Sequence, residues 1–419
     1  MKSPVAIAIF AAVSLSLSAN QAVAQRPRGH VVVPASSIAK AGDAGKRAHT
    51  NVRIFVPDGG FKNANPFAGP PFSGYGFETP ASIGCLYHLT TAVAGCNPNT
   101  VTANPGGGSK AIAIVDAYDD PDAVTDLTNF CKQFGVAFNK TQFKVVFASG
   151  TRPAKDPTGG WEFEESLDIE WAHAMAPNAK LYLVEATSDS LSDLYDAVGV
   201  ASGLVSAAGG GEVSMSWGSG EYDDEAADDS TFTTSGVVYL ASTGDAEGVE
   251  YPSVSPNVVA AGGTTISRNP TTLAFQQEVG WNLAGGGPSD LEPIPAYQGT
   301  IDTIVGTARG VPDLSFDSDP DSGVWVLDSI PYNGEGGPGS WWIAGGTSLA
   351  VQGLAGIVNS SGHFKTSSIA ELTMIYNNLG TTHFRDIMKG SCYYYNGFFA
   401  AKGWDFCTGV GSVNGKGGV

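Results

Sequence analysis

The chain has 419 residues, of which 42% are hydrophobic and 15% charged, and this length allows a large buried core in one or two domains. The formal net charge of −19 argues against nucleic acid or an anionic membrane as a partner, because both are negatively charged. An excess of acidic over basic residues suits a protein that works at low pH, where protonation relieves the repulsion between carboxylates.

The N-terminus has the features of a secretory signal peptide over residues 1–24. Lys2 supplies a positive start, residues 5–17 are apolar or small, and residues 22–24 (Ala-Val-Ala) form a small-x-small cleavage site. The alternative, a membrane anchor, requires a longer apolar core. We therefore predict an exported protein, extracellular or periplasmic, with no membrane partner.

Residues 25–75 are polar and rich in glycine and proline, and we expect an N-terminal extension or linker there, followed by a globular domain over residues 76–419. The strands are expected at 111–116, 144–148, 181–184, 213–217, 237–241, 257–261 and 324–327, and the helices at 122–134, 163–175, 191–205 and 348–358. Alternating helices and nearly continuous apolar strands predict an α/β fold, a three-layer sandwich with a mostly parallel sheet and helices on both faces.

The sequence contains five cysteines. Because export permits disulfides, the local pairs Cys85–Cys96 and Cys392–Cys407 are the natural expectation. Cys131 falls in a helix-like segment and is expected to be a buried free thiol. No cysteine spacing is typical of a zinc site.

The expected helix at 163–175 carries Glu164 and Asp168, which are four residues apart and share a helix face. Two carboxylates placed in this way repel each other unless they share a proton, which raises the pKa of one of them. A carboxyl group with a raised pKa is a usable general base. A solvated acidic helix face is the alternative, although Leu167 and Ile169 indicate partial burial.

Two further residues fall where a sheet of this kind places its ligands. Asp245 follows the strand at 237–241; a turn or capping role is one interpretation, and a protonated carboxyl that donates to an oxyanion is the other. Ser348 follows Gly345-Gly346 at the start of a helix, where its backbone N–H and the helix dipole favour an oxyanion. Ser348 is therefore a candidate nucleophile, and since no histidine has an obvious catalytic setting, its base is expected to be a carboxylate.

Four segments, taken in order, make the chain resemble the sedolisin family of serine-carboxyl peptidases. They are Glu164-x-x-x-Asp168 with the residues up to Pro177, then 214–218 (Ser-Met-Ser-Trp-Gly), 242–245 (Ser-Thr-Gly-Asp) and 345–348 (Gly-Gly-Thr-Ser). Residues 309–313 (Arg-Gly-Val-Pro-Asp) also resemble a family segment, and the likeness covers residues 76 to 412. The resemblance implies a subtilisin-like fold in which carboxylates replace the catalytic histidine.

The resemblance also implies roles for the matching residues. Ser348 is expected to be the nucleophile and Glu164 its general base, with Asp168 orienting Glu164. Asp245 is expected to complete the oxyanion hole together with the Ser348 backbone N–H.

Two more positions, Trp217 and Asp116, lie where the family has partners that support the catalytic glutamate, although Asp116 equally fits a helix cap. The chain departs from the family pattern in two ways. Gln352 stands where a proline is usual, a change expected to affect local stiffness more than chemistry. The long N-terminal prodomain of the family is missing, so the chain either folds unaided or uses a short inhibitory segment.

A second resemblance concerns metal binding near the C-terminus. Asp386, Ile387, Ala401, Gly403 and Asp405 resemble the calcium site of the family. Carboxylates and backbone carbonyls are hard oxygen ligands, which calcium prefers and zinc does not.

These features predict a secreted, calcium-stabilised, monomeric endopeptidase that hydrolyses polypeptides at acidic pH through an acyl-enzyme intermediate on Ser348. A tripeptidyl exopeptidase and a non-catalytic binding protein on a peptidase scaffold are the alternatives. A histidine-dependent subtilisin is disfavoured because His173 is offset from the face that Glu164 and Asp168 share.

Overall fold

The computed structural model describes residues 27–61, 69–72, 74–330, 340–392 and 397–419, so the expected signal peptide lies outside the described residues. The helices are α1 (Pro80–Leu86), α2 (Ala123–Phe134), α3 (Gly160–Met175), α4 (Leu191–Ala207), α5 (Glu225–Asp228), α6 (Asp302–Val305), α7 (Thr347–Ser361) and α8 (Ser368–Asn377). The first strands are β1 (Gly29–Val32), β2 (His49–Thr50), β3 (Arg53–Pro57), β4 (Ala111–Ala117), β5 (Phe143–Phe147), β6 (Lys180–Ala186), β7 (Gly211–Met215), β8 (Trp217–Gly220), β9 (Val237–Ser242) and β10 (Glu250–Tyr251). The later strands are β11 (Val259–Arg268), β12 (Phe275–Gly280), β13 (Gly287–Pro293), β14 (Ala308–Val311), β15 (Leu314–Asp317), β16 (Val324–Asp328), β17 (Ser340–Gly345), β18 (Phe384–Arg385), β19 (Ser391–Cys392), β20 (Phe398–Phe399) and β21 (Ser412–Val413).

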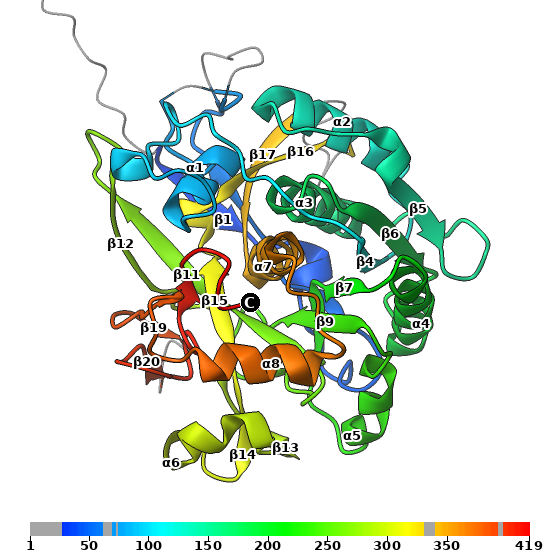
Figure 1. Cartoon of the computed structure of the whole chain (residues 1–419). Helices are drawn as coiled ribbons and strands as arrows, with labels where there is room; N and C mark the ends of the chain where they lie inside the picture. Colours follow the sequence, from blue (N-terminus) through cyan, green and yellow to red (C-terminus); the bar gives the residue numbers. More distant parts are fainter. Residues whose placement is uncertain (1–26, 62–68, 73, 331–339, 393–396) are drawn as a thin grey trace, which may run out of the picture.

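A large central sheet organises the molecule (Figure 1), with the strand order β18-β21-β15-β11-β9-β7-β4-β6-β5 and with β12 added beside β11. Within this order, the neighbouring strands pair in parallel along the stretch β15-β11-β9-β7-β4-β6-β5. The strands β12 and β18 are antiparallel to their neighbours. Each strand run and helix expected from the sequence overlaps an observed element, although the run at 213–217 divides into β7 and β8.

Helices cover both faces of this sheet, and the alternation along β4 shows how. Ile112 and Ile114 point into the core shared with α2, α3 and α7. Ala113 and Val115, one residue out of phase, point into the core shared with α4. In Figure 1, α3 and α7 lie next to each other on one side of the sheet and α4 lies on the other. The predicted three-layer α/β class is confirmed.

The described part of residues 25–75 is built into sheets rather than left free as a linker. β2 pairs with β8, which directly follows the central strand β7. β3 lies between β1 and β17 in a second, antiparallel sheet of order β1-β3-β17-β16. Because β17 leads into α7, this N-terminal segment lies beside the start of that helix.

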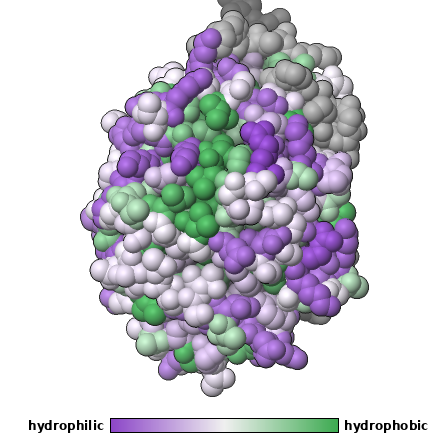
Figure 2. Space-filling model, turned by 90° about the vertical axis from the view of Figure 1, so that its right-hand side faces the viewer, coloured by the Kyte–Doolittle hydropathy of each residue, from purple (hydrophilic) through white to green (hydrophobic). Residues whose placement is uncertain are grey.

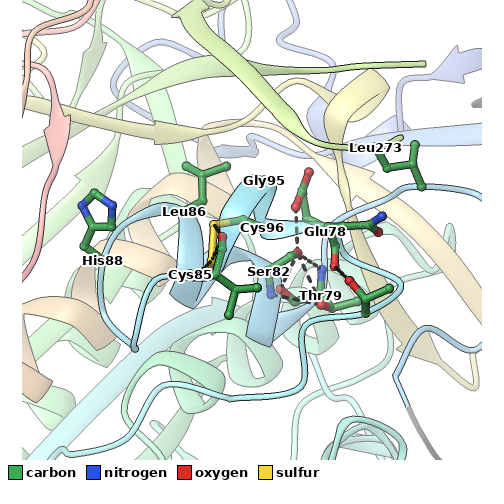
Figure 3. Close-up of a disulfide and its surroundings, with 12 residues drawn as sticks. Glu78, Thr79, Ser82, Cys85, Leu86, His88, Gly95, Cys96 and Leu273 are labelled. Carbon is green, nitrogen blue, oxygen red and sulfur yellow. Dashed lines mark hydrogen bonds between the residues drawn. A yellow bond between two sulfur atoms is a disulfide. The ribbon is translucent and has the colours of Figure 1, made fainter. Parts of the chain in front are cut away.

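Both predicted disulfides, Cys85–Cys96 and Cys392–Cys407, are confirmed, and Cys131 is a buried free cysteine. Cys85 is in the last turn of α1, and Figure 3 shows its bond to Cys96 together with residues that cap the helix at its start. There the side chain of Thr79 accepts from Ser82 N, and the Ser82 hydroxyl accepts from Thr79 N. This reciprocal cap satisfies backbone donors at the first turn of α1.

Hydrophobic side chains are not confined to the interior. Figure 2 shows one face, on which a hydrophobic patch is bordered by hydrophilic residues. Among the described residues, no helix has the length and apolar character needed to cross a membrane.

Candidate active site

Three elements bring the predicted catalytic residues together. α3 carries Glu164 and Asp168, α7 begins one residue before Ser348, and Asp245 follows β9. α3 and α7 pack against each other, and the backbone N–H of Thr347 at the start of α7 donates to Asp245 Oδ1 at 2.7 Å. The four side chains therefore meet where β9 and β17 end.

The helix α3 is unusual because every residue from 160 to 175 is buried, acidic ones included. Its N-terminus is capped by Asp156, whose Oδ2 accepts from the backbone N–H groups of Gly160 and Trp161. The helix ends before Pro177, as the sequence predicts. The alternative of a solvated acidic face is wrong, because Glu164 and Asp168 are both fully buried.

Burial raises the pKa of Glu164 well above its usual value, and the nearby charge of Asp116 adds to this, while hydrogen bonding to Ser348 and Asp168 opposes it. Burial likewise raises the pKa of Asp168, and the charges of Asp116 and Glu164 raise it further. Neither Glu164 oxygen has a hydrogen-bond partner among the described residues, so Ser348 and Asp168 lie near Glu164 without forming a geometrically complete hydrogen bond to it. Because both pKa values are raised, the pair holds a proton that the two carboxyl groups can share.

Asp116 lies at the end of β4, fully buried, and burial raises its pKa to about 8. It caps no helix: neither of its oxygens has a hydrogen-bond partner in the described structure, and α2 begins at Ala123. Trp217 is also buried, but its indole N–H donates to Val115 O at 2.8 Å rather than to a carboxylate. Asp116 therefore raises the pKa of Glu164 and of Asp168 when it is ionised, and Trp217 holds β8 against β4.

Asp245 is held by Thr347, whose hydroxyl donates to Asp245 Oδ1 at 3.0 Å in addition to the backbone bond. The other oxygen, Oδ2, accepts no hydrogen bond in the described structure and lies 3.6 Å from Arg53 Nε. Burial raises the pKa of Asp245 to about 7, against the opposing charge of Arg53. Below that pH the carboxyl group is protonated and has a proton to donate.

Ser348 is fully buried at the start of α7, and its hydroxyl donates to Ser216 O at 3.3 Å. Gly346, just before the helix, has φ of 112°, and a Cβ there would collide with the carbonyl oxygen of Asn51 and lie 2.7 Å from Asp245 Oδ2. Only glycine fits this turn without strain. The turn is thus what lets Asp245 approach the serine.

Gln352 is a site residue that the sequence interpretation undervalued. Its amide Nε2 donates to Asp168 Oδ2 at 2.5 Å and to Ser216 Oγ at 2.9 Å. It lies one helical turn after Ser348 on α7, and this spacing is the signal that could have placed it on the same face. The departure from the family proline therefore reaches the catalytic pair.

His173 is on α3 but faces away from the site. Its Nε2 bonds to Ala137 O at 2.9 Å, its ring packs edge-on against Phe138, and burial lowers its pKa. This core histidine makes no contact with Ser348 among those the structure describes.

The residues expected to bind calcium lie together in the C-terminal loops. Asp405 accepts hydrogen bonds from the backbone N–H groups of Ala401, Cys407 and Thr408. Asp386 accepts from Gly403 N, which joins the two loops. Among the described residues, no group of three or more acidic, histidine or cysteine side chains converges. Any cation here would therefore take most of its oxygens from the backbone.

No family model matches the chain, but several known proteins are similar to it. Kumamolisin from Bacillus sp. (strain MN-32) is 28% identical over 344 residues, covering 73% of this chain and 58% of kumamolisin. Sedolisin from Pseudomonas sp. (strain 101) is 26% identical over 350 residues, covering 74% and 57%. Xanthomonalisin from Xanthomonas sp. (strain T-22) is 27% identical over 402 residues, covering 77% and 46%. The chain spans about half the length of these curated relatives.

Solved structures agree on the fold. Pseudomonas sedolisin, a serine-carboxyl proteinase complexed with two molecules of pseudo-iodotyrostatin, aligns with a TM-score of 0.65 and 23% identity, covering 81% of this chain and 95% of that one. Sphericase aligns with a TM-score of 0.52 and 18% identity, covering 80% and 99%. The fold is the subtilisin-like α/β sandwich. Within that class, these matches support the resemblance of the chain to the sedolisin family.

Proposed function

We propose that this protein is a secreted serine-carboxyl endopeptidase that hydrolyses polypeptides at acidic pH. The observation that carries the proposal is the buried pair Glu164 and Asp168 beside the hydroxyl of Ser348. The two disulfides fit an oxidising compartment outside the cytoplasm. The similarity to sedolisin-type peptidases supports the peptidase class.

In this mechanism Ser348 Oγ attacks the carbonyl carbon of the substrate while Glu164 takes the hydroxyl proton. Asp168 stabilises the charge on Glu164 through the proton they share. The oxyanion accepts hydrogen bonds from Ser348 N–H and from the protonated Asp245, aided by the N-terminus of α7. Glu164 then protonates the leaving amine, and water hydrolyses the acyl-enzyme by the same steps in reverse.

Acid activity follows from the pKa directions. Asp245 donates to an oxyanion only when protonated, and its pKa is about 7, raised mainly by burial. Asp168 must likewise keep its proton, and burial raises its pKa above the usual range as well. Activity is therefore expected below neutrality and is lost as pH rises and Asp245 ionises.

The test is digestion of a denatured protein such as casein at pH 3–5. Ser348→Ala is expected to reduce turnover by at least about 10⁴-fold, because no other hydroxyl replaces the nucleophile. Ser360→Ala, in the last turn of α7, is the matched control and should digest at the normal rate. Activity retained in Ser348→Ala would refute the assignment.

We also propose that calcium stabilises the C-terminal loops. Asp405 lies in the loop that the Cys392–Cys407 disulfide closes, and Asp386 lies just before that loop and accepts from Gly403 N within it; carboxylates and backbone carbonyls from these segments are hard oxygens of the kind calcium prefers. Calcium at 100 times its Kd is expected to add about 3 kcal/mol to the free energy of unfolding. Asp386→Asn should abolish that calcium-dependent gain, measured by thermal unfolding. An unfolding midpoint that ignores calcium would exclude the site.

A further inference from the structure

Asp245 lies on an irregular turn of residues 244–248, which we call the Asp245 turn. This turn connects β9 to β10 and belongs to neither strand. Ala246 and Glu247 are exposed, so the outer side of the turn has little packing of its own. The position of the Asp245 carboxyl group therefore depends on the contacts that hold the two ends of the turn.

A loop of three glycines, residues 285–287, binds both ends of the Asp245 turn. Gly285 N donates to Gly244 O at 2.8 Å, and Gly286 N donates to Gly248 O at 2.9 Å. Two successive backbone donors thus bridge the first and the last residue of the turn. We call residues 285–287 the glycine loop.

The Asp245 turn is also tied to α7, through the side chain of Thr347. The Thr347 hydroxyl accepts from Gly244 N at 3.1 Å and donates to Asp245 Oδ1 at 3.0 Å. Because one hydroxyl joins Gly244 to the carboxyl group, a shift of Gly244 also disturbs the carboxyl group of Asp245. The bond from the glycine loop to Gly244 O therefore bears on the proposed oxyanion donor.

Close approach to backbone atoms explains why the glycine loop has no side chains. A Cβ on Gly285 would collide with the carbonyl oxygen of Thr243, and a Cβ on Gly286 would collide with the carbonyl oxygen of Phe406. Both glycines are buried. Since a backbone oxygen cannot rotate away as a side chain can, any larger residue must displace the loop or the turn.

The C-terminal segment contacts the same loop. The ring of Phe398 would lie 3.3 Å from a Cβ on Gly287, and it packs on the ring of Phe406 with the two centroids 4.4 Å apart. The next residue, Cys407, is joined to Cys392. Contacts with both the Asp245 turn and this disulfide-closed segment leave the glycine loop little room to move.

We propose that Gly285 and Gly286 are positioning residues for the proposed peptidase reaction, because their N–H groups hold the Asp245 turn with its carboxyl group directed at the oxyanion. This inference rests on the proposed function. Neither glycine touches the reacting atoms, so both act through Asp245. An oxyanion donor stabilises the transition state more than the bound substrate, so a displaced turn should lower kcat and leave KM nearly unchanged.

The first test is Gly285→Ala, assayed with a peptide substrate at acidic pH. The displaced turn should lower kcat by about 10²-fold, the loss expected for one oxyanion donor, with KM within about threefold of normal. A peptide aldehyde, to which the Ser348 hydroxyl adds to form a hemiacetal, should lose affinity by a similar factor. Gly84→Ala is the matched control: its Cβ would lie 2.8 Å from Pro105 Cγ, so it crowds a buried glycine on α1 while kcat and aldehyde affinity should stay normal.

A second variant keeps the proposal testable if Gly285→Ala does not fold. Gly248 has φ of 104° with open space around a Cβ, so Gly248→Ala strains the carbonyl that accepts from Gly286 without any collision. It should lower kcat and aldehyde affinity about tenfold. Gly209→Ala, just after α4, carries the same kind of strain at φ of 93° in open space, and should keep the normal kcat.

The pH–rate profile distinguishes a positioning role from general damage to the fold. Burial raises the pKa of Asp245 to about 7, and a turn that opens toward solvent should lower it again. The alkaline limb of kcat should therefore move to lower pH in Gly285→Ala and Gly248→Ala and stay in place in the two controls. The charged neighbours Arg53 and Glu250, which lower and raise that pKa, are the same in all four variants.

Casein digestion separates failure of this inference from failure of the proposed function. If digestion depends on Ser348 but the folded variants keep a normal kcat, aldehyde affinity and alkaline limb, the positioning role is refuted and the peptidase stands. A loss confined to KM would refute the positioning role as well, because it would place the loop in substrate binding. If digestion does not depend on Ser348, the proposed function itself fails.

Discussion

Two regions of this molecule bury carboxyl groups in opposite ways. Asp313 is fully buried and receives both ends of a guanidinium, with Arg309 Nη1 at 2.8 Å from Oδ1 and Nη2 at 2.6 Å from Oδ2. Ala260 N and the Tyr376 hydroxyl donate to it as well. Around α3, by contrast, Asp116 and Glu165 are fully buried, and none of their oxygens has a hydrogen-bond partner in the described structure.

The contrast shows that buried acids follow their surroundings rather than their residue type. Asp313 faces a fixed cation and several donors, which satisfy both of its carboxylate oxygens. A carboxylate that faces only other acids becomes neutral by keeping its proton, because an unpaired buried charge costs too much. The catalytic pair belongs to the second group, so its proton sharing is a property of the whole α3 region.

The largest effect is expected from breaking the paired region. Arg309→Met leaves Asp313 as an unmatched buried charge and should lower the free energy of unfolding by about 3–5 kcal/mol at pH 6. Arg152→Met is the control, because the Arg152 side chain is 60% exposed and lies 3.5 Å from Asp119; its cost should stay below about 1 kcal/mol. Urea unfolding measures the free energy of unfolding of both variants. Equal losses in the two would show that the buried Arg309–Asp313 pair contributes no more to stability than an exposed pair.

A second prediction concerns the unpaired region and pH. Burial raises the pKa of Asp120 to about 8 and of Glu185 to about 9, both above the value of about 4 expected in the unfolded chain. Groups with raised pKa bind more protons when folded, so their stabilisation is complete below pH 4 and is lost as pH rises to 8–9. The free energy of unfolding should fall steadily over that range.

The matched test is Asp120→Asn, which removes one such proton. It should flatten the fall by up to about 1.4 kcal/mol per pH unit, measured by urea unfolding at each pH. Asp196→Asn, on the exposed face of α4, should leave the slope unchanged. If Asp120→Asn leaves the slope of the unfolding free energy against pH unchanged, groups other than Asp120 cause the pH dependence.

The sequence predicted the features that depend on residues close together in the chain. The strand β4, the helix α3 and both disulfides follow from short-range pattern, and so does the helix start at Ser348. The segment around Asn51 is expected to be an extension because residues 25–75 are polar, rich in glycine and proline and weakly periodic, whereas pairing with β8 and β17, distant in sequence, builds it into sheets. Likewise, α3 has no solvent-exposed residue because it packs against α7 and other elements. The spacing of residues along one helix does not reveal such packing.

Replacing Gln352 is expected to have the smallest effect of these changes. It tests the difference between the two regions most closely, because Gln352 is a hydrogen-bond donor fixed among the buried acids around α3. Gln352→Met removes the N–H that favours the ionised form of Asp168, so the pKa of Asp168 should rise further. Turnover of casein-derived peptides should then fall about tenfold in kcat with little change in KM, since Asp168 loses its orientation. The alkaline limb of the pH–rate profile should also move to higher pH. Gln352→Glu, whose protonated form donates a hydrogen bond, should recover part of the rate at pH 3 only. If Gln352 only fills space, its replacement would change stability without moving the alkaline limb. An unchanged pH–rate profile in Gln352→Met would therefore show that Gln352 has only a packing role.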